Sequence, residues 1–347
     1  MRGVIVLAAL LLGCGGGHVV TSERRVPPSD AEVLVSFVAA TTCASPAPVE
    51  LDGAVVAAHC RQLTAALARH RERWLGPVRA HFAGLPAVAR VFYPFAGADP
   101  MTVLAVYPAA TDIVTVSLEP LKLPTDLGAL SRARLYQALG RLRRAAGALL
   151  DASYSATRDL AGLTADLPLL GVAFVGLAAV GATPVALRSF DLATDGSVVH
   201  PGPHLEVELR LSSGATATWR HLVLDLSDHG LPPALTAHLA RAPYAALVKA
   251  GAYLLWRRAF SRTLALVLAA RLIVADSSGP RPADARAAGF TLHPAGHFVT
   301  AALPTPDAGA ERDLGALFSG APALGFRFGY ASTGAAPDEG HVLIYQR

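Results

Sequence analysis

The sequence predicts an α/β fold of the mixed α+β kind: a mixed sheet flanked by helices, with an antiparallel meander in the second half. Apolar runs of strand length and stretches with helical spacing interleave without the strict alternation of a purely parallel α/β protein. Between residues 184 and 226, strand-like runs are separated by Asp195-Gly196 and Ser212-Ser213-Gly214, which are typical turn residues. The 347 residues, 52% of them hydrophobic, are sufficient for a sizeable core.

Helices are expected where apolar residues recur every three or four positions. The ranges with this spacing are 31–40, 49–82, 126–155, 167–182, 235–239, 244–255 and 260–272. An uncharged stretch at 167–187 contains Pro168 and Pro184, so it favours a buried helix followed by a strand over a membrane span.

Strands are expected where short runs are rich in Val, Ile, Phe and Tyr. These runs are 88–95, 102–107, 113–118, 184–193, 205–211 and 215–226, with a terminal pair at 324–330 and 342–345. The stretch 280–306 is predicted to be rich in loops, and no internal repeat is visible.

The N-terminus has the pattern of a bacterial lipoprotein signal. Arg2 precedes nine uncharged apolar residues, 4–12, and Gly13 precedes Cys14. This apolar core is of signal-peptide length and too short to span a bilayer as a mature helix. The pattern predicts a signal peptide at 1–13, lipid on Cys14, a flexible tether at 14–30 and one mixed α/β domain at 31–347, with a helical subregion at 31–85. An ordinary secretory signal with a chance cysteine remains the alternative.

Lipidation at Cys14 would place the protein in the cell envelope, anchored to a membrane. Gly15 occupies the position where an aspartate would resemble an inner-membrane retention signal, so the outer membrane is favoured, facing the periplasm or the surface. The expected partners are the membrane, through the N-terminal lipid, and an envelope ligand or protein. No nucleic acid and no cofactor is expected in that compartment.

The charged residues do not identify a partner. They make up 16% of the chain, and the net charge of +4 is carried almost wholly by arginine, since Lys122 and Lys249 are the only lysines. The densest arginine cluster, at 132–144, has leucines at core-facing spacing, which is typical of a solvated helix face. Contact with anionic lipid headgroups is the alternative for a tethered protein.

Cys43 and Cys60 remain as a pair if Cys14 carries lipid. An exported compartment favours their oxidation, and a disulfide would stabilise the fold by about 3 kcal/mol. Two buried free thiols are the alternative.

Several short segments, in order, resemble a family of uncharacterised bacterial exported proteins. The segments are Phe92-Tyr93-Pro94-Phe95-Ala96-Gly97-Ala98-Asp99, Leu118-Glu119-Pro120, Leu224-Asp225-Leu226-Ser227-Asp228, Ala252-Tyr253-Leu254, Ile273-Val274-Ala275-Asp276-Ser277-Ser278-Gly279 and Phe326-Arg327-Phe328-Gly329-Tyr330. The family pattern has Asp where this chain has Ser277 and Gln where it has Ala275. The resemblance covers about residues 85–345 and implies an envelope location, but it implies no reaction.

Familiar catalytic signatures are missing from the sequence. It contains no G-x-S-x-G elbow, H-E-x-x-H helix, P-loop or paired C-x-x-C. The histidine pairs at 200/204 and 293/297 are interrupted by proline and glycine, which prevents a helix from aligning them on one face, so no metal site is predicted.

Acidic and hydroxyl groups instead follow the predicted strands and helices. Because strand-end loops commonly surround a ligand crevice, we expect some of these groups to converge. The candidate catalytic residues are Asp99, Glu119, Asp276 and Ser278. The candidate ligand-binding residues are Tyr93, Asp225, Asp228 and His229.

Three functions for these carboxylates remain open. The first is structural, because Asp before Pro, Glu before Pro and Asp-Ser-Ser-Gly are common in turns and caps. The second is ligand binding. The third is hydrolysis of an envelope sugar or peptide linkage by Asp99, Glu119 and Asp276, since burial and mutual repulsion would raise the pKa of one carboxyl and leave another ionised. The leading hypothesis is a ligand- or partner-binding envelope protein, and the hydrolase is the alternative.

Overall fold

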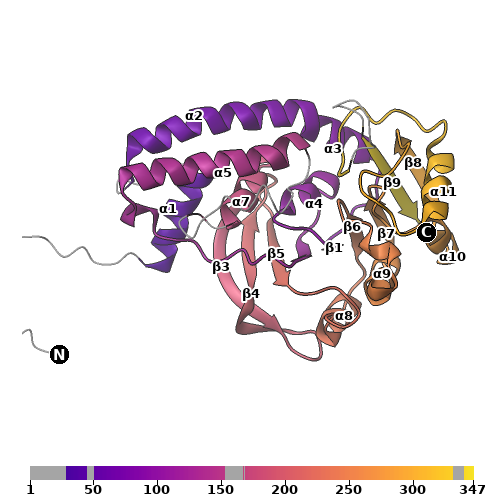
Figure 1. Ribbon diagram of the computed structural model, residues 1–347. Helices are drawn as coiled ribbons and strands as arrows, with labels where there is room; N and C mark the ends of the chain where they lie inside the picture. Colours follow the sequence, from indigo (N-terminus) through magenta and orange to yellow (C-terminus); the bar gives the residue numbers. More distant parts are fainter. Residues whose placement is uncertain (1–28, 45–50, 153–166, 168, 331–339) are drawn as a thin grey trace, which may run out of the picture.

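A nine-stranded mixed sheet organises the part of the chain that the structure describes. The computed structural model describes residues 29–44, 51–152, 167, 169–330 and 340–347. The strand order is β3-β4-β5-β2-β1-β6-β7-β9-β8. Helices pack on both faces of this sheet (Figure 1), so the predicted mixed α/β fold is confirmed.

The central strands are parallel and the two edges are antiparallel. The five central parallel strands are β5 (Thr216–Val223), β2 (Asp112–Ser117), β1 (Arg90–Tyr93), β6 (Ala245–Val248) and β7 (Leu272–Ala275). The antiparallel strands are β3 (Thr183–Leu192) and β4 (Val198–Arg210) at one edge, and β9 (His341–Gln346) and β8 (Thr291–Gly296) at the other. The expected antiparallel meander is therefore β3-β4-β5.

Residues within the central strands alternate between two separate hydrophobic clusters. Val91 and Tyr93 of β1 belong to the first cluster, whereas Phe92 belongs to the second. The same alternation places Leu247 of β6 in the first cluster and Val248 in the second. Both faces of these strands are therefore buried, as is usual for parallel strands covered by helices.

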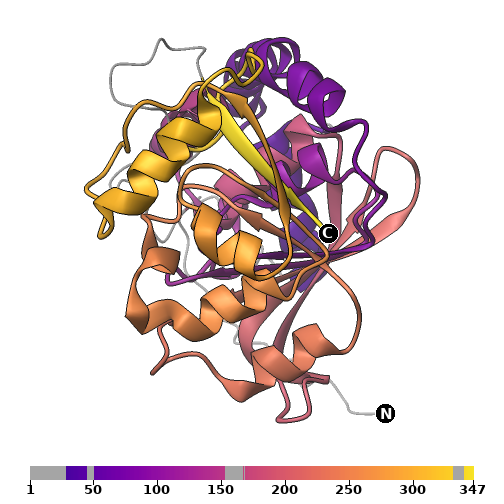
Figure 2. The ribbon, with the colours of Figure 1, turned by 90° about the vertical axis from the view of Figure 1, so that its right-hand side faces the viewer.

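Each cluster has its own set of helices. The first cluster lies under α1 (Asp30–Thr42), α2 (Gly53–His70), α3 (Gly76–Phe82), α4 (Pro100–Val106), α5 (Arg132–Ala152) and α7 (Leu170–Ala179). The second lies under α8 (Pro233–Ala240), α9 (Ser261–Leu268), α10 (Pro282–Ala287) and α11 (Ala308–Phe318). Figure 2 shows this second, C-terminal set in orange and yellow on the side facing the viewer.

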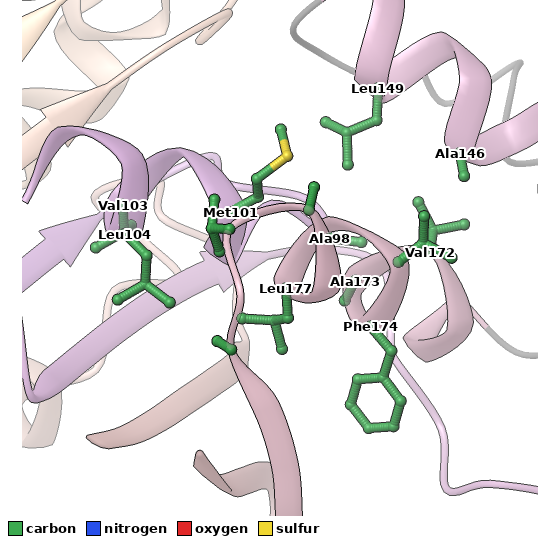
Figure 3. Packing of buried hydrophobic residues seen from close by; sticks show 14 of the residues in the cluster. Ala98, Met101, Val103, Leu104, Ala146, Leu149, Val172, Ala173, Phe174 and Leu177 are labelled. Carbon is green, nitrogen blue, oxygen red and sulfur yellow. The ribbon is translucent and has the colours of Figure 1, made fainter. Parts of the chain in front are cut away.

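The N-terminal helices form a layer with its own tight packing. Figure 3 shows buried side chains of α4, α5 and α7, with Leu149 of α5 directed toward Met101 of α4. A Cβ at Gly176 would lie 3.1 Å from the Cβ of Met101, so glycine permits the close approach of α7 to α4. At the end of this layer, α1 and α2 are joined by the expected Cys43–Cys60 disulfide, with a Cα–Cα distance of 5.5 Å.

The order of the strands reverses at the centre of the sheet. From β1 the chain crosses through α4, on the first face, to β2 on one side. From β6, on the other side of β1, it crosses through α9, on the second face, to β7. Because parallel crossovers are right-handed, crossovers on opposite faces move in opposite directions, which leaves a crevice at the carboxyl ends of the strands where the direction changes.

The strand predicted at 102–107 is wrong, because residues 102–106 lie in the helix α4 and Tyr107 follows its last residue. Asp99 precedes the helix, and its side chain accepts a hydrogen bond from the backbone N–H of Thr102 at 3.0 Å. Pro100 occupies the first turn, where its missing N–H has no effect. All seven residues of α4 are buried, so no polar face produces a helical period in the sequence.

The helix predicted at 244–255 is also wrong, because residues 245–248 form strand β6. Its sequence Ala-Ala-Leu-Val is buried on both faces, so it lacks the alternation of a half-exposed strand, and alanine and leucine favour a helix by intrinsic propensity. The prediction that a helix precedes Asp276 is wrong in the same way, because Asp276 directly follows strand β7.

The predicted C-terminal strand pair is half wrong. Residues 342–345 lie in β9, but this strand pairs with β7 and β8, and residues 324–330 are not a strand. Gly325 and Gly329 have positive φ values of 73° and 62°, which interrupt an extended backbone. The region 280–306, predicted to be rich in loops, contains α10 and β8.

The predicted signal peptide, the lipidation site Cys14 and nearly all of the tether lie outside the described residues. Among the helices of the described ranges, none has the length and apolar character needed to span a membrane.

Candidate functional site

A pocket lies at the carboxyl ends of four adjacent parallel strands, β5, β2, β1 and β6. Its volume is about 640 Å³, within the usual range for small-molecule sites. Four segments form most of its lining: 93–99 after β1, 117–119 after β2, 224–226 after β5 and 249–252 after β6. We call it the carboxyl-edge pocket. It coincides with the reversal of strand order between β1 and β6, where the fold leaves a crevice.

A buried ion pair lies in this pocket. Lys249 Nζ is 2.5 Å from Asp99 Oδ2 and donates a hydrogen bond to Thr102 Oγ1 at 2.5 Å. Thr102 Oγ1 in turn donates to Asp99 Oδ2 at 2.7 Å. Lys249 and Asp99 are only 1% and 4% exposed, yet both line the pocket. The pair therefore presents a neutralised charge to a ligand.

Tyr93 belongs to the same cluster. Its hydroxyl donates to Asp99 Oδ2 at 3.4 Å. Burial, reinforced by the negative charge of Asp99, raises the pKa of Tyr93 well above its ordinary value. Tyr93 is therefore a neutral hydrogen-bonding group at physiological pH.

Asp276 holds the surrounding loops together from outside the pocket lining. Its Oδ1 accepts from the backbone N–H of Ser278 at 2.8 Å and from Ser278 Oγ at 2.5 Å. Its Oδ2 accepts from the backbone N–H groups of Ala250 and Tyr330 at 2.8 and 2.9 Å. The hydroxyl oxygen of Ser278 also accepts from the N–H of Gly251 at 2.8 Å. Asp276 and Ser278 thus fix the backbone of pocket-lining residues.

The lining contains an unusual concentration of left-handed backbone. Phe95, Ala250 and Ala252 have φ values of 59°, 53° and 51°, and Tyr253 beside them has 55°. Such conformations cost about 1–3 kcal/mol each for residues other than glycine, and they cluster at functional sites. Here the Asp276 hydrogen bonds stabilise one of these residues, Ala250, directly.

Glu119 lines the pocket on a turn supported by a buried histidine. Ser117 Oγ lies 3.2 Å from His221 Nε2 and donates to the Glu119 carbonyl at 3.1 Å. His221 Nε2 is 3.3 Å from the same carbonyl, and Nδ1 is 3.0 Å from Thr115 Oγ1. Burial lowers the pKa of His221 to about 4, so it is neutral at physiological pH. This network positions Glu119.

The remaining predicted residues follow strand β5. Asp225 lines the pocket, is exposed, and accepts from Ser227 N–H and Oγ, both at 2.8 Å. Asp228 and His229 are outside the lining. Asp228 accepts from the N–H of Arg262 at 2.8 Å, in the first turn of α9, which is a capping role.

The sequence therefore identified four residues of one pocket, Tyr93, Asp99, Glu119 and Asp225, and missed Lys249. The helix expected at 244–255 concealed the strand end at which Lys249 lies. A signal was nevertheless present, because Lys249 is one of only two lysines and interrupts an apolar run. The His221 support for Glu119 had no sequence signal, since the two residues are far apart in the chain.

Within the described ranges, no group of three or more His, Cys, Asp or Glu side chains is arranged to hold a metal ion. The fold and pocket define a doubly wound α/β protein with a small-molecule-sized crevice at the carboxyl edge of its sheet. No family model, no curated protein and no solved structure matches the chain.

Proposed function

We propose that this protein binds a small molecule in the carboxyl-edge pocket and is held at the cell envelope by lipid on Cys14. The observation that carries the proposal is the position of the 640 Å³ pocket at the reversal of strand order, with a buried Asp99–Lys249 pair in its lining. Ligands of open α/β sheets bind at this position. The positive φ values of Phe95, Ala250 and Ala252 support the same conclusion.

The geometry supports binding better than hydrolysis by the three acids. General acid and base catalysis needs carboxylates that both reach one bond. Asp276 lies outside the pocket lining, and its two oxygens accept four hydrogen bonds. Asp99 is buried against Lys249 and accepts hydrogen bonds from the backbone N–H and the hydroxyl of Thr102, so its oxygens are occupied within the protein.

The envelope location is supported by the N-terminal sequence pattern and by the Cys43–Cys60 disulfide, which is typical of exported proteins. Mass spectrometry of protein extracted from the membrane of a host that processes lipoproteins tests this part. The expected mass lacks residues 1–13 and includes lipid on Cys14. A soluble, unlipidated product would contradict the anchor without affecting the pocket.

A thermal-shift screen of a small-molecule library tests the pocket. Leu303 lines the pocket and is 41% exposed, whereas Val299 is 62% exposed and does not line it. We expect Leu303→Trp to fill the pocket and abolish the shifts of genuine ligands, and the matched Val299→Trp to leave them unchanged. Binding that is insensitive to Leu303→Trp would place the ligand elsewhere and refute the proposed function.

A further inference from the structure

We infer that the ligand of the carboxyl-edge pocket carries a cationic amino group beside an apolar body; this inference rests on the proposed function. Among the described lining residues the charged groups are three carboxylates, Asp99, Glu119 and Asp225, and one ammonium, Lys249. Three carboxylates and one ammonium give the lining a formal charge of −2. The chain as a whole is +4, so the pocket is opposite in sign to the protein.

The pocket excludes anions for the same reason. The positive charge of Lys249 is opposed at 2.5 Å by Asp99 Oδ2, and a ligand carboxylate or phosphate would also meet Glu119 and Asp225. Like charges in a partly buried site repel more strongly than they do in water. An ammonium group, in contrast, is attracted to both carboxylates.

The walls are suited to a cation with an apolar body. Phe95 and Phe260 form an edge-to-face pair with ring centroids 5.9 Å apart, and both line the pocket. A ring face within about 6 Å of a cation attracts it. Leu118 and Leu303, which are 69% and 41% exposed, add apolar surface to the lining. Exposed leucines of this size are covered when an apolar group enters the pocket.

The Glu119 backbone and the Asp225 carboxylate are held in place before a ligand arrives. The Ser117–His221 network supports the backbone carbonyl of Glu119, and the Ser227 hydrogen bonds hold the carboxylate of Asp225. Each carboxylate oxygen accepts more than one hydrogen bond, so Asp225 retains capacity for an ammonium. Pre-organised groups of this kind lower the entropy lost on binding.

Isothermal titration calorimetry with three matched compounds tests the inference. The compounds are 4-phenylbutylamine, 4-phenylbutanol and 4-phenylbutanoate, at pH 7 and low ionic strength. We expect the amine to bind at least tenfold more tightly than the alcohol, and the carboxylate to bind more weakly than the alcohol. Added salt should weaken binding of the amine and leave the affinity for the alcohol unchanged.

The double variant Glu119→Gln/Asp225→Asn should reduce the affinity for the amine at least tenfold and leave the affinity for the alcohol within twofold of that of the unaltered protein. The matched control Glu72→Gln/Asp313→Asn removes two exposed charges outside the pocket and should change neither affinity. The ligand series on the unaltered protein decides the question even if the double variant does not fold.

Two results overturn the inference and separate it from the proposed function. One such result is equal affinity for the amine and the alcohol. The other is that the library ligands whose binding is lost in Leu303→Trp are neutral or acidic. Either result would refute a cationic ligand without contradicting the pocket as a binding site. Absence of any ligand sensitive to Leu303→Trp would refute both.

Discussion

Four carboxylates at one edge of the sheet divide into a buried pair and a rim pair. Asp99 and Asp276 are 4% and 0% exposed, whereas Glu119 is half-buried and Asp225 is exposed. All four follow parallel strands, so chain position does not separate them. The degree of burial separates the two pairs. A buried carboxylate requires hydrogen-bond donors or a counter-charge, and these partners give it a structural role. The rim pair remains accessible to a ligand.

The largest expected effect is at Asp276. Asp276→Asn replaces one acceptor oxygen by an NH₂ group, which faces backbone N–H groups that the carboxylate now satisfies. Buried donors without acceptors cost about 1–3 kcal/mol each, so we expect a loss of about 4 kcal/mol in the free energy of unfolding. Urea denaturation measures it. A loss below 1 kcal/mol would show that Asp276 is not a structural centre.

The Asp99–Lys249 pair should come next. Lys249→Met removes one partner and leaves a buried carboxylate, for which we expect a loss of about 3 kcal/mol. The double variant Asp99→Asn/Lys249→Met removes both charges and should recover part of this loss. Urea midpoints of the two variants give the comparison, and a double variant less stable than the single one would contradict the assignment of a mutually dependent pair.

The pH dependence of the free energy of unfolding tests whether His221, which supports the turn that carries Glu119, is buried and neutral. Because burial lowers the pKa of His221 from 6.5 to about 4, the unfolded chain takes up a proton at a higher pH than the folded chain. The stabilisation from His221 is complete above pH 6.5 and declines as the pH falls toward 4. Between pH 7.5 and 4.5 it should fall by about 2.5 kcal/mol.

Urea denaturation at these two pH values, with and without His221→Gln, isolates this contribution. In His221→Gln the free energy of unfolding should differ less between the two pH values. The control His229→Gln changes an exposed histidine and should not reduce this difference. His59, whose pKa is also lowered to about 4 by burial and by Arg143, leaves a residual pH dependence in the variant. An unchanged difference in His221→Gln would contradict a buried neutral His221.

The comparison also explains what the sequence could predict. Amphipathic helices such as α2, and strands bounded by turns such as β3, were predictable because one side of each meets solvent and produces a period. The helix α4 and the strand β6 were not, since both are buried on all sides and the period disappears. Both flank the pocket, so the errors fell on Lys249 and Thr102.

The roles of the acids could not be separated from sequence for a related reason. Asp99 and Asp225 both follow an apolar strand, but only tertiary structure brings Lys249 beside Asp99. Similarly, Asp228 was grouped with the pocket, although its carboxylate caps the first turn of α9.

The smallest expected effect is at the rim, and it is the sharpest test of the division. Glu119→Gln and Asp225→Asn should each change the free energy of unfolding by less than about 0.5 kcal/mol, because both side chains reach solvent. At position 225 an amide oxygen can still accept from the Ser227 N–H, and the amide NH₂ can donate to the Ser227 hydroxyl, which then acts as the acceptor. Asp228→Asn, at a half-buried capping carboxylate, is the control, with an expected loss of about 1 kcal/mol. Urea denaturation distinguishes these values. A rim variant that loses as much stability as Asp276→Asn would place the rim carboxylates among the structural ones.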